Sequence, residues 1–206
     1  MSLLKVTFVA LISTYTTDND LKSTLWNEIE VHYSSPKRHY HTLKHLENLL
    51  QELLGVQDEL HHWDTILFTL FYHDLIYDVL KSNNEEKSAE IAVLRMNQLA
   101  VSTDSIDHCR SQILATKSHQ LANDQDTNYF TDADLAVLGQ SWEVYAEYAK
   151  NVRKEYSIYP DLLYNPGRKK VLNHFLAMDS IYKTNTFKKK YENSAKENLK
   201  KELLGL

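Results

Sequence analysis

Two histidines near residue 43 are spaced as a pair that could bind one metal ion. His41 and His45 are four positions apart, so on a helix their side chains would point the same way, one turn apart. They would lie opposite the apolar stripe that begins at Leu43 and Leu46. Both imidazoles could ligate one metal, or one could ligate while the other supports it. The alternative is a solvated polar face, which these residues alone favour.

A histidine and an aspartate directly follow the most apolar run of the chain. Residues 66–72 precede His73-Asp74, and Leu75-Ile76 come next. A carboxylate buried there must be neutralised or paired. A divalent cation bound by this imidazole and carboxylate would do so, and such ligands suit Mn²⁺, Fe, Co²⁺ or Zn²⁺ better than Ca²⁺. The alternative, that Asp74 turns outward near a helix end, fits the dipeptide equally well.

A third motif, Thr131-x-x-Asp134, comes just before an apolar helical pattern. It approximates a capping box, although Glu or Gln is the usual fourth residue. Asp132 and Asp134 in a first turn would also suit the helix dipole. By itself the motif predicts a helix that starts at Thr131, and it does not indicate any chemistry.

In this order along the chain, the motifs resemble the HD-domain superfamily of metal-dependent phosphohydrolases. The matching segments are 40–45 (YHTLKH), 71–78 (FYHDLIYD), 84–89 (NEEKSA) and 132–135 (DADL). With 115–119 (ATKSH) and the stretch from Arg168 to Glu202, the chain looks like the subgroup of predicted metal-dependent HD phosphohydrolases. The resemblance spans about residues 20 to 204.

The resemblance implies a metal ion bound by His41, His73, Asp74 and Asp134. His45 falls where many HD domains carry an apolar residue. It is expected either to support the site, to contact the substrate or, as the least favoured choice, to replace His41 as a ligand.

The number and kind of metal ions also follow from the resemblance. HD members with two metals carry additional histidines between the His-Asp pair and the last Asp. His108 and His119 lie in that interval, but their spacing does not match the two-metal pattern well. We therefore expect one divalent transition metal, Mn, Fe, Co or Zn, with Mg²⁺ as a further candidate.

The reaction implied is hydrolysis of a phosphomonoester or phosphodiester by metal-activated water. Two positions would remain on a six-coordinate ion for water or a phosphate oxygen, and the metal would lower the pKa of the water and polarise the phosphorus centre. Glu85, more than Glu86, is expected to act as a general base or to orient water, although acidic residues are favoured at a helix start in any case. A nucleotide substrate is suggested only by analogy.

Cationic side chains must meet the charge of the phosphate. The candidates are Lys117, His119, Arg153 and Arg168. Lys117 ranks first because it lies beside His119, in the loop that leads to the last Asp. The alternative for each is a surface ion pair, and Glu147 and Glu155 are near enough in sequence to pair with Arg153. The expected catalytic residues are Asp74, Glu85, Lys117 and His119, and the expected substrate contacts are His45, Lys117, Arg153 and Arg168.

The hydrophobic pattern that positions these residues is helical throughout. We expect an all-α, compact HD-like bundle of about eight helices, with residues 65–72 buried on every side. The expected helices cover about 18–33, 40–54, 60–80, 85–99, 103–117, 131–156, 168–182 and 186–204, and a short apolar stretch at 6–12 is also helical. Loops are expected at 119–128 and 159–167, the second because it holds two prolines and a glycine.

Composition sets the class of protein. With 206 residues, 43% of them apolar and 25% charged, the chain is expected to be one soluble domain, with a core of about 20–160 and C-terminal helices at about 168–204. Only 4 Gly and 3 Pro exclude most all-β folds, which need frequent turns. One cysteine cannot form an intrachain disulfide, so a reducing cytoplasm is expected.

Charge and hydropathy bear on the partners. The stretch 183–202 is rich in lysine, but Glu192, Glu197 and Glu202 are interleaved at helical spacing, so we expect a solvated helix face and no nucleic acid polymer. The apolar stretch at 6–12 is too short to cross a membrane. A small-molecule phosphoester is the expected partner, and a homodimer is compatible with a helical enzyme.

Two other functions compete with hydrolysis. One is a non-catalytic HD-type module that senses a nucleotide or a metal. The other is a helical interaction domain with structural histidines, which the full set of four expected ligands argues against. Tyr40, Tyr72 and Tyr77 flank the proposed ligands; aromatic residues at helical spacing fill a core more often than they stack on a base.

Overall fold

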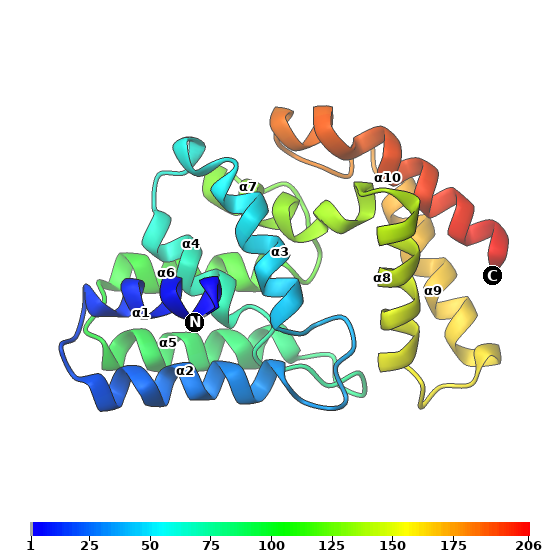
Figure 1. The fold of residues 1–206 in the computed structure, drawn as a ribbon. Coiled ribbons are helices and arrows are strands. Elements are labelled where there is room, and N and C mark those ends of the chain that lie inside the picture. Colours follow the sequence, from blue (N-terminus) through cyan, green and yellow to red (C-terminus); the bar gives the residue numbers. More distant parts are fainter. Residues whose placement is uncertain (1) are drawn as a thin grey trace. The chain divides into compact units, whose positions relative to one another are not determined.

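The computed structural model describes residues 2–206, and every regular element in that range is helical (Figure 1). The expected all-α class is confirmed, with ten α-helices and two 3-10 helices in the described residues. The elements are α1 (Leu3–Ser13), α2 (Asn19–Tyr33), α3 (Leu43–Leu54), η1 (Gln57–Glu59), α4 (Trp63–Tyr72), α5 (Asn84–Gln98), α6 (Thr103–Ala115), α7 (Gln125–Asp134), η2 (Leu135–Gly139), α8 (Trp142–Glu155), α9 (Asp161–Leu176) and α10 (Asn185–Gly205).

The chain forms two compact units, Met1–Thr131 and Asp132–Leu206. The boundary lies inside α7, whose last three residues belong to the second unit.

In the first unit, α4 forms the centre. It packs against α1, α3, α5 and α6, and every residue from Thr65 to Tyr72 is buried, as the apolar run predicted. Phe71 makes an edge contact with Phe8 of α1, with ring centroids 4.8 Å apart. Because neighbours surround α4 on all sides, the residue that follows it, His73, is fixed at the end of a rigid element.

The short apolar stretch near the N-terminus is part of α1. Leu4, Phe8, Leu11 and Ile12 form the buried face of this helix, which packs against α2, α3 and α4. The expected helix is confirmed. Among residues 2–206, no helix combines the length and the apolar character that a membrane span requires.

The starts of α2 and α3 follow from their caps. The Asp18 carboxylate accepts the N–H groups of Asp20 and Leu21, as predicted. In α3 the cap is Thr42, whose hydroxyl accepts the N–H of Lys44 at 3.3 Å. The helix therefore begins at Leu43 and not near Tyr40, so His41 precedes the helix that carries His45.

The helix expected over 60–80 is shorter, because α4 ends at Tyr72. Side chains of α5 hold the chain that follows in a non-helical path. The Ser88 hydroxyl accepts the N–H of Ile76 at 3.0 Å. The Asn84 amide accepts the N–H of Asp78 at 3.1 Å and donates to its carbonyl at 3.0 Å. His73 and Asp74 thus lie at the junction of a buried helix and a tied-down loop.

The prediction of a loop at 119–128 followed by a helix from Thr131 was wrong in part. Helix α7 begins at Gln125, where Asp124 accepts the N–H of Thr127 at 2.8 Å and so caps the first turn. Thr131 lies inside this helix, and its hydroxyl donates to the Thr127 carbonyl at 2.9 Å. The helix start was predicted at the wrong residue because α7 buries polar residues, among them Asp126 and Thr131. A polar segment of this kind looks like a loop in the sequence.

The prediction of a loop at 159–167 was also wrong, because α9 begins at Asp161 and contains Pro166. A proline in a helix removes one backbone hydrogen bond. Here Tyr164, Arg168 and Leu172, spaced by four, are all buried. The burial of this stripe outweighs the loss of one hydrogen bond.

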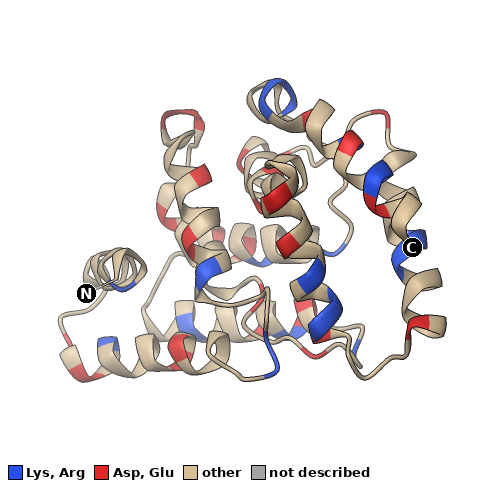
Figure 2. Ribbon diagram, turned by 45° about the vertical axis from the view of Figure 1, so that its right-hand side comes forward, with Lys and Arg blue, Asp and Glu red and all other residues tan. Residues whose placement is uncertain are grey.

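In the second unit, α10 packs against η2, α8 and α9 (Figure 1). Its buried stripe includes Phe187, Tyr191, Ala195 and Leu199. The expected solvated face is found only in part: Lys200 and Glu197 are exposed, whereas Glu192 and Glu202 are partly buried, Glu192 against the Ile181 N–H and Glu202 against Arg168 (Figure 2).

The approach of η2 to α10 depends on a glycine. A Cβ at Gly139 would lie 2.4 Å from Cβ of Tyr191 and 2.8 Å from its carbonyl oxygen. We expect Gly139→Ala to lower the free energy of unfolding by about 1–3 kcal/mol, since the backbones must move apart. Urea denaturation would measure this loss.

Gly167 provides the matched control, because a Cβ there meets nothing within 4 Å and the residue lies inside α9. Gly167→Ala should raise stability by about 0.5–1 kcal/mol through its helix propensity. Equal effects of the two substitutions would contradict the close approach at Gly139.

Candidate metal centre

His73 is oriented by a backbone carbonyl. The side chain is 1% exposed, and its Nδ1 lies 3.0 Å from the carbonyl oxygen of Leu70, one turn earlier. A carbonyl can only accept a hydrogen bond, so Nδ1 carries the proton. In the neutral ring, Nε2 is then the unprotonated nitrogen, which is the arrangement commonly found in metal-binding histidines.

Two further atoms that could bind a metal lie close to Nε2 of His73. Nε2 of His73 lies 3.2 Å from Oδ2 of Asp74 and 3.2 Å from Nε2 of His45. Nε2 of His45 is 3.8 Å from the same carboxylate oxygen. Nitrogen lone pairs and an anionic oxygen at these separations are stabilised by a shared cation or by a proton between them. The residues present therefore fit a divalent metal ion bound by His45, His73 and Asp74.

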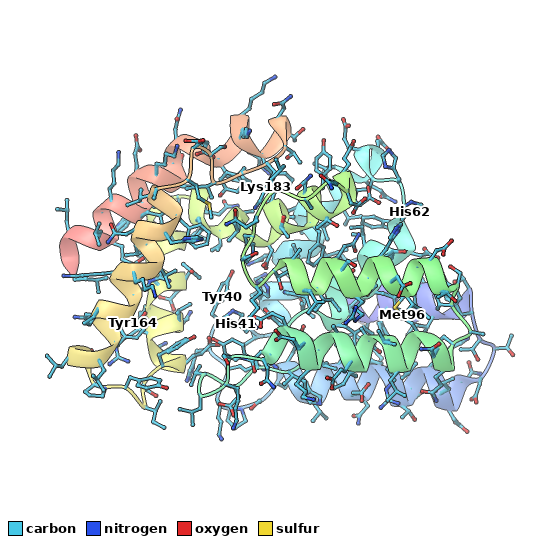
Figure 3. The ribbon with its side chains drawn as sticks, turned by 180° about the vertical axis from the view of Figure 1, so that it is seen from behind. Tyr40, His41, His62, Met96, Tyr164 and Lys183 are labelled. Atoms are coloured by element: carbon cyan, nitrogen blue, oxygen red, sulfur yellow. The ribbon has the colours of Figure 1, made fainter. Side chains whose placement is uncertain are left out.

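His41 lies at the edge of the same group. Its Nε2 is 3.9 Å from Oδ2 of Asp74, and its side chain is 19% exposed, against 4% for His45. The imidazole packs on the ring of Tyr77, with centroids 4.1 Å apart and planes inclined by 30°. Tyr40 lies next to His41 (Figure 3) and contacts the rings of both histidines. Both histidines of the pair thus reach one carboxylate, although only His45 is on α3.

Asp134, the fourth expected ligand, is the last residue of α7 and belongs to the second unit. Asp132, two positions before Asp134, fixes the local backbone. Asp132 is fully buried and accepts the N–H groups of Lys183 and Thr184 at 2.8 and 2.7 Å, and the Thr184 hydroxyl at 2.8 Å. The chain at Asp132–Asp134 is therefore tied to the start of α10.

Lys183 completes this attachment. Its ammonium nitrogen is buried and lies 3.3 Å from the Asp132 carboxylate. Burial lowers the pKa of Lys183 and raises that of Asp132, although each partner opposes the shift of the other. No local pattern indicates this structural role of Asp132, because Lys183 and Thr184 are 51 and 52 residues away in the chain.

Lys117 contacts both glutamates that open α5. Its ammonium group lies 2.5 Å from Oε1 of Glu86 and 3.8 Å from Oε2 of Glu85, and it donates to the Ser82 carbonyl at 2.6 Å. The hydrogen bond with Glu86 raises the pKa of Lys117 and lowers that of the carboxyl. The structure thus places Lys117 beside Glu85 and Glu86, which the sequence motifs linked only through their expected roles in catalysis.

His119, the other histidine expected to be catalytic, follows α6 with a left-handed backbone, φ 53°. This conformation is uncommon for residues other than glycine. The N–H of His119 donates to the Ala115 carbonyl at 2.9 Å and so closes the end of the helix. The side chain is partly exposed.

The two expected substrate-binding arginines lie in the second unit and pair with carboxylates there. Arg153 donates to Asp161 at 2.7 and 3.0 Å, so its acidic partner is neither of the glutamates near it in sequence. Arg168 is buried and holds Glu202 of α10 with two parallel bonds of 2.7 and 2.9 Å. Both guanidinium groups therefore connect helices of the unit.

Searches of protein-family models, curated proteins and solved structures gave no match to this chain. The resemblance to HD phosphohydrolases accordingly remains a prediction from the sequence motifs.

The pairing of Arg168 with Glu202 can be tested by stability. Arg168→Met leaves the Glu202 carboxylate, whose side chain is only 12% exposed, without its cation, so we expect the free energy of unfolding to fall by about 3–5 kcal/mol. The double variant with Glu202→Met should recover much of this loss. Urea denaturation of the three proteins provides the measurement, and a single variant as stable as the wild type would show that the pair does not hold the helices.

Proposed function

We propose that this protein is a metal-dependent phosphohydrolase that binds one divalent transition metal. The observation that carries the proposal is the meeting of the His45, His73 and Asp74 donor atoms within 4.8 Å of one another. His41 lies beside this group, and Asp134 stays the fourth ligand expected from the sequence motif. Mn, Fe, Co and Zn suit imidazole and carboxylate ligands, and Mg²⁺ is a further candidate.

The metal group and the cluster of Glu85 with Lys117 would divide the work of hydrolysis. A bound divalent cation would supply Lewis acidity for the attack of water on a phosphoester. Glu85, whose carboxylate is partly exposed, would accept a proton from that water. Lys117 is 43% exposed. Its ammonium group would leave its carboxylate partner and bind a phosphate oxygen, whose negative charge it would neutralise.

The substrate class follows from the same groups. A phosphomonoester or phosphodiester of a small molecule would fit one metal and one cation, and a nucleotide is a candidate by analogy with HD enzymes. We propose a cytoplasmic location from the cysteine content, and a homodimer is compatible with the proposal.

A second candidate function is a non-catalytic module that senses a nucleotide or a metal. The contact of Lys117 with Glu86 and Glu85 favours it, because the proposed base and the proposed phosphate-binding cation partly neutralise each other. Turnover separates the two candidates. A sensor would show ligand-induced thermal stabilisation without hydrolysis.

Metal content is the direct test of the site. We expect near one transition metal per wild-type chain by mass spectrometry, on protein purified without chelator, and loss of the metal in Asp74→Asn. The control is Asp78→Asn, in the same loop, because an asparagine there can still accept the N–H of Leu80. A wild-type protein that holds no metal after reconstitution with Mn²⁺, Fe²⁺ and Co²⁺ would overturn the proposal.

Parallel variants decide which histidine is the ligand. His45→Gln is expected to weaken metal binding more than His41→Gln, since His45 is the more buried and its nitrogen faces His73. Calorimetric titration with Co²⁺ would measure both affinities. The opposite order would assign the ligand to His41, as the sequence motif alone implied.

Hydrolysis of p-nitrophenyl phosphate and of its bis ester, with added Mn²⁺ or Co²⁺, tests the catalytic residues. We expect Glu85→Gln to lower kcat by about 10²- to 10⁴-fold, as loss of a general base does. Glu90→Gln, on the same helix and paired with Lys87 at the surface, is the control. Equal rates for the two variants would remove Glu85 from the mechanism.

A further inference from the structure

Arg38 lies next to the candidate metal centre, in the segment between α2 and α3. The residue is only 7% exposed. One terminal nitrogen donates to the carbonyl oxygens of His41 at 3.1 Å and Asp74 at 2.8 Å, and the other donates to the carbonyl of Leu75 at 2.7 Å. One guanidinium group thus contacts the backbone of two residues of the site.

Among the described residues, no carboxylate forms an ion pair with this buried cation. Within residues 2–206, all hydrogen bonds of its guanidinium go to those three carbonyls. Two aromatic rings cover it, Tyr33 at 4.7 Å and Tyr77 at 5.5 Å from their centroids. Burial of an ion costs free energy, which the carbonyl dipoles and the ring faces offset. A side chain held in this way fixes the groups that it contacts.

The contacts of Arg38 join two segments that are far apart in the sequence. His41 belongs to the turn before α3, whereas Asp74 and Leu75 follow α4. Tyr77 extends the same arrangement, because its ring lies against both Arg38 and the imidazole of His41. The separation between the histidine segment and the aspartate therefore depends on the reach of the guanidinium.

The opposite end of the aspartate loop is held independently. Ser88 and Asn84 of α5 bind the backbone of Ile76 and Asp78. Those bonds fix the loop to α5 but do not connect it to the segment that carries His41. Lysine could not replace Arg38, because a single ammonium lacks the planar fork that reaches three acceptors.

We propose that Arg38 is a positioning residue of the metal centre, which sets the distance between the histidine segment and Asp74 by bridging their backbone carbonyls. The inference rests on the proposed function, since it assumes that these donor atoms bind a metal. It predicts that metal affinity and ligand geometry change when the bridge is altered, even where the fold persists.

The test is titration of the whole protein with Co²⁺, monitored by calorimetry and by the visible absorption of the bound ion. We expect Arg38→Lys to bind Co²⁺ about 10- to 100-fold more weakly than the wild type, as loss of an outer support does, and to shift the absorption bands. Arg95→Lys is the matched control, because this arginine joins α2 and α5 through Glu28. Its affinity and spectrum should equal those of the wild type, whatever stability it loses.

A second variant covers the case in which Arg38→Lys does not fold. Tyr77→Leu keeps the guanidinium but removes the ring between it and His41, and it should also weaken Co²⁺ binding and shift the bands. If Arg38→Lys folds, unchanged Co²⁺ affinity and an unchanged spectrum would overturn the inference. If it does not fold, the same result for Tyr77→Leu would overturn it. Neither result would count against the metal site itself. A wild type that binds no Co²⁺ would instead overturn the proposed function, and the inference with it.

Discussion

The hydrogen bond from Nδ1–H of His73 to the Leu70 carbonyl is the interaction on which the candidate site depends. It orients the ring and leaves the lone pair of Nε2 directed at Asp74 and His45. The bond is possible because α4 is buried on every side, so its last turn cannot shift to accommodate a different ring orientation. The apolar run at 65–72 therefore does more than fill the core, since it also sets the direction of the imidazole.

The rest of the first unit supports that geometry from outside the buried helix. Asp74 lies beyond the end of α4, where the backbone is no longer helical and needs other partners for its polar groups. Arg38 supplies them on one side, and Ser88 and Asn84 supply them on the other. A guanidinium from a distant segment and an amide and a hydroxyl from the next helix therefore hold the non-helical loop, which explains how it keeps a carboxylate in a defined position.

The sequence predicted most of the helices of the first unit, because their apolar stripes or caps are local signals. Residues 65–72 and the Asp18 cap are examples. It failed at α7 and α9, where the stabilising contacts are tertiary: α7 buries Asp126 and Asp132 against partners far along the chain, and α9 tolerates Pro166 because Tyr164 and Arg168 are buried. His73 and Asp74 were visible as an adjacent polar pair after an apolar run, whereas Arg38 resembled any arginine in a polar loop.

The cations show the same limit and bear on the chemistry. Lys117, Arg153 and Arg168 were selected because phosphate needs positive charge, but each holds a carboxylate in the structure. Arg168 is buried and the Glu202 side chain is only 12% exposed, so exchanging that carboxylate for a ligand would leave a charge without its partner. Lys117 and Glu86 are exposed, and an exposed pair of this kind contributes little free energy, so its exchange costs little. Lys117 can therefore release its carboxylate at a lower cost than Arg168, and in the proposed mechanism it would turn to the phosphate while the metal would carry the remainder of the charge.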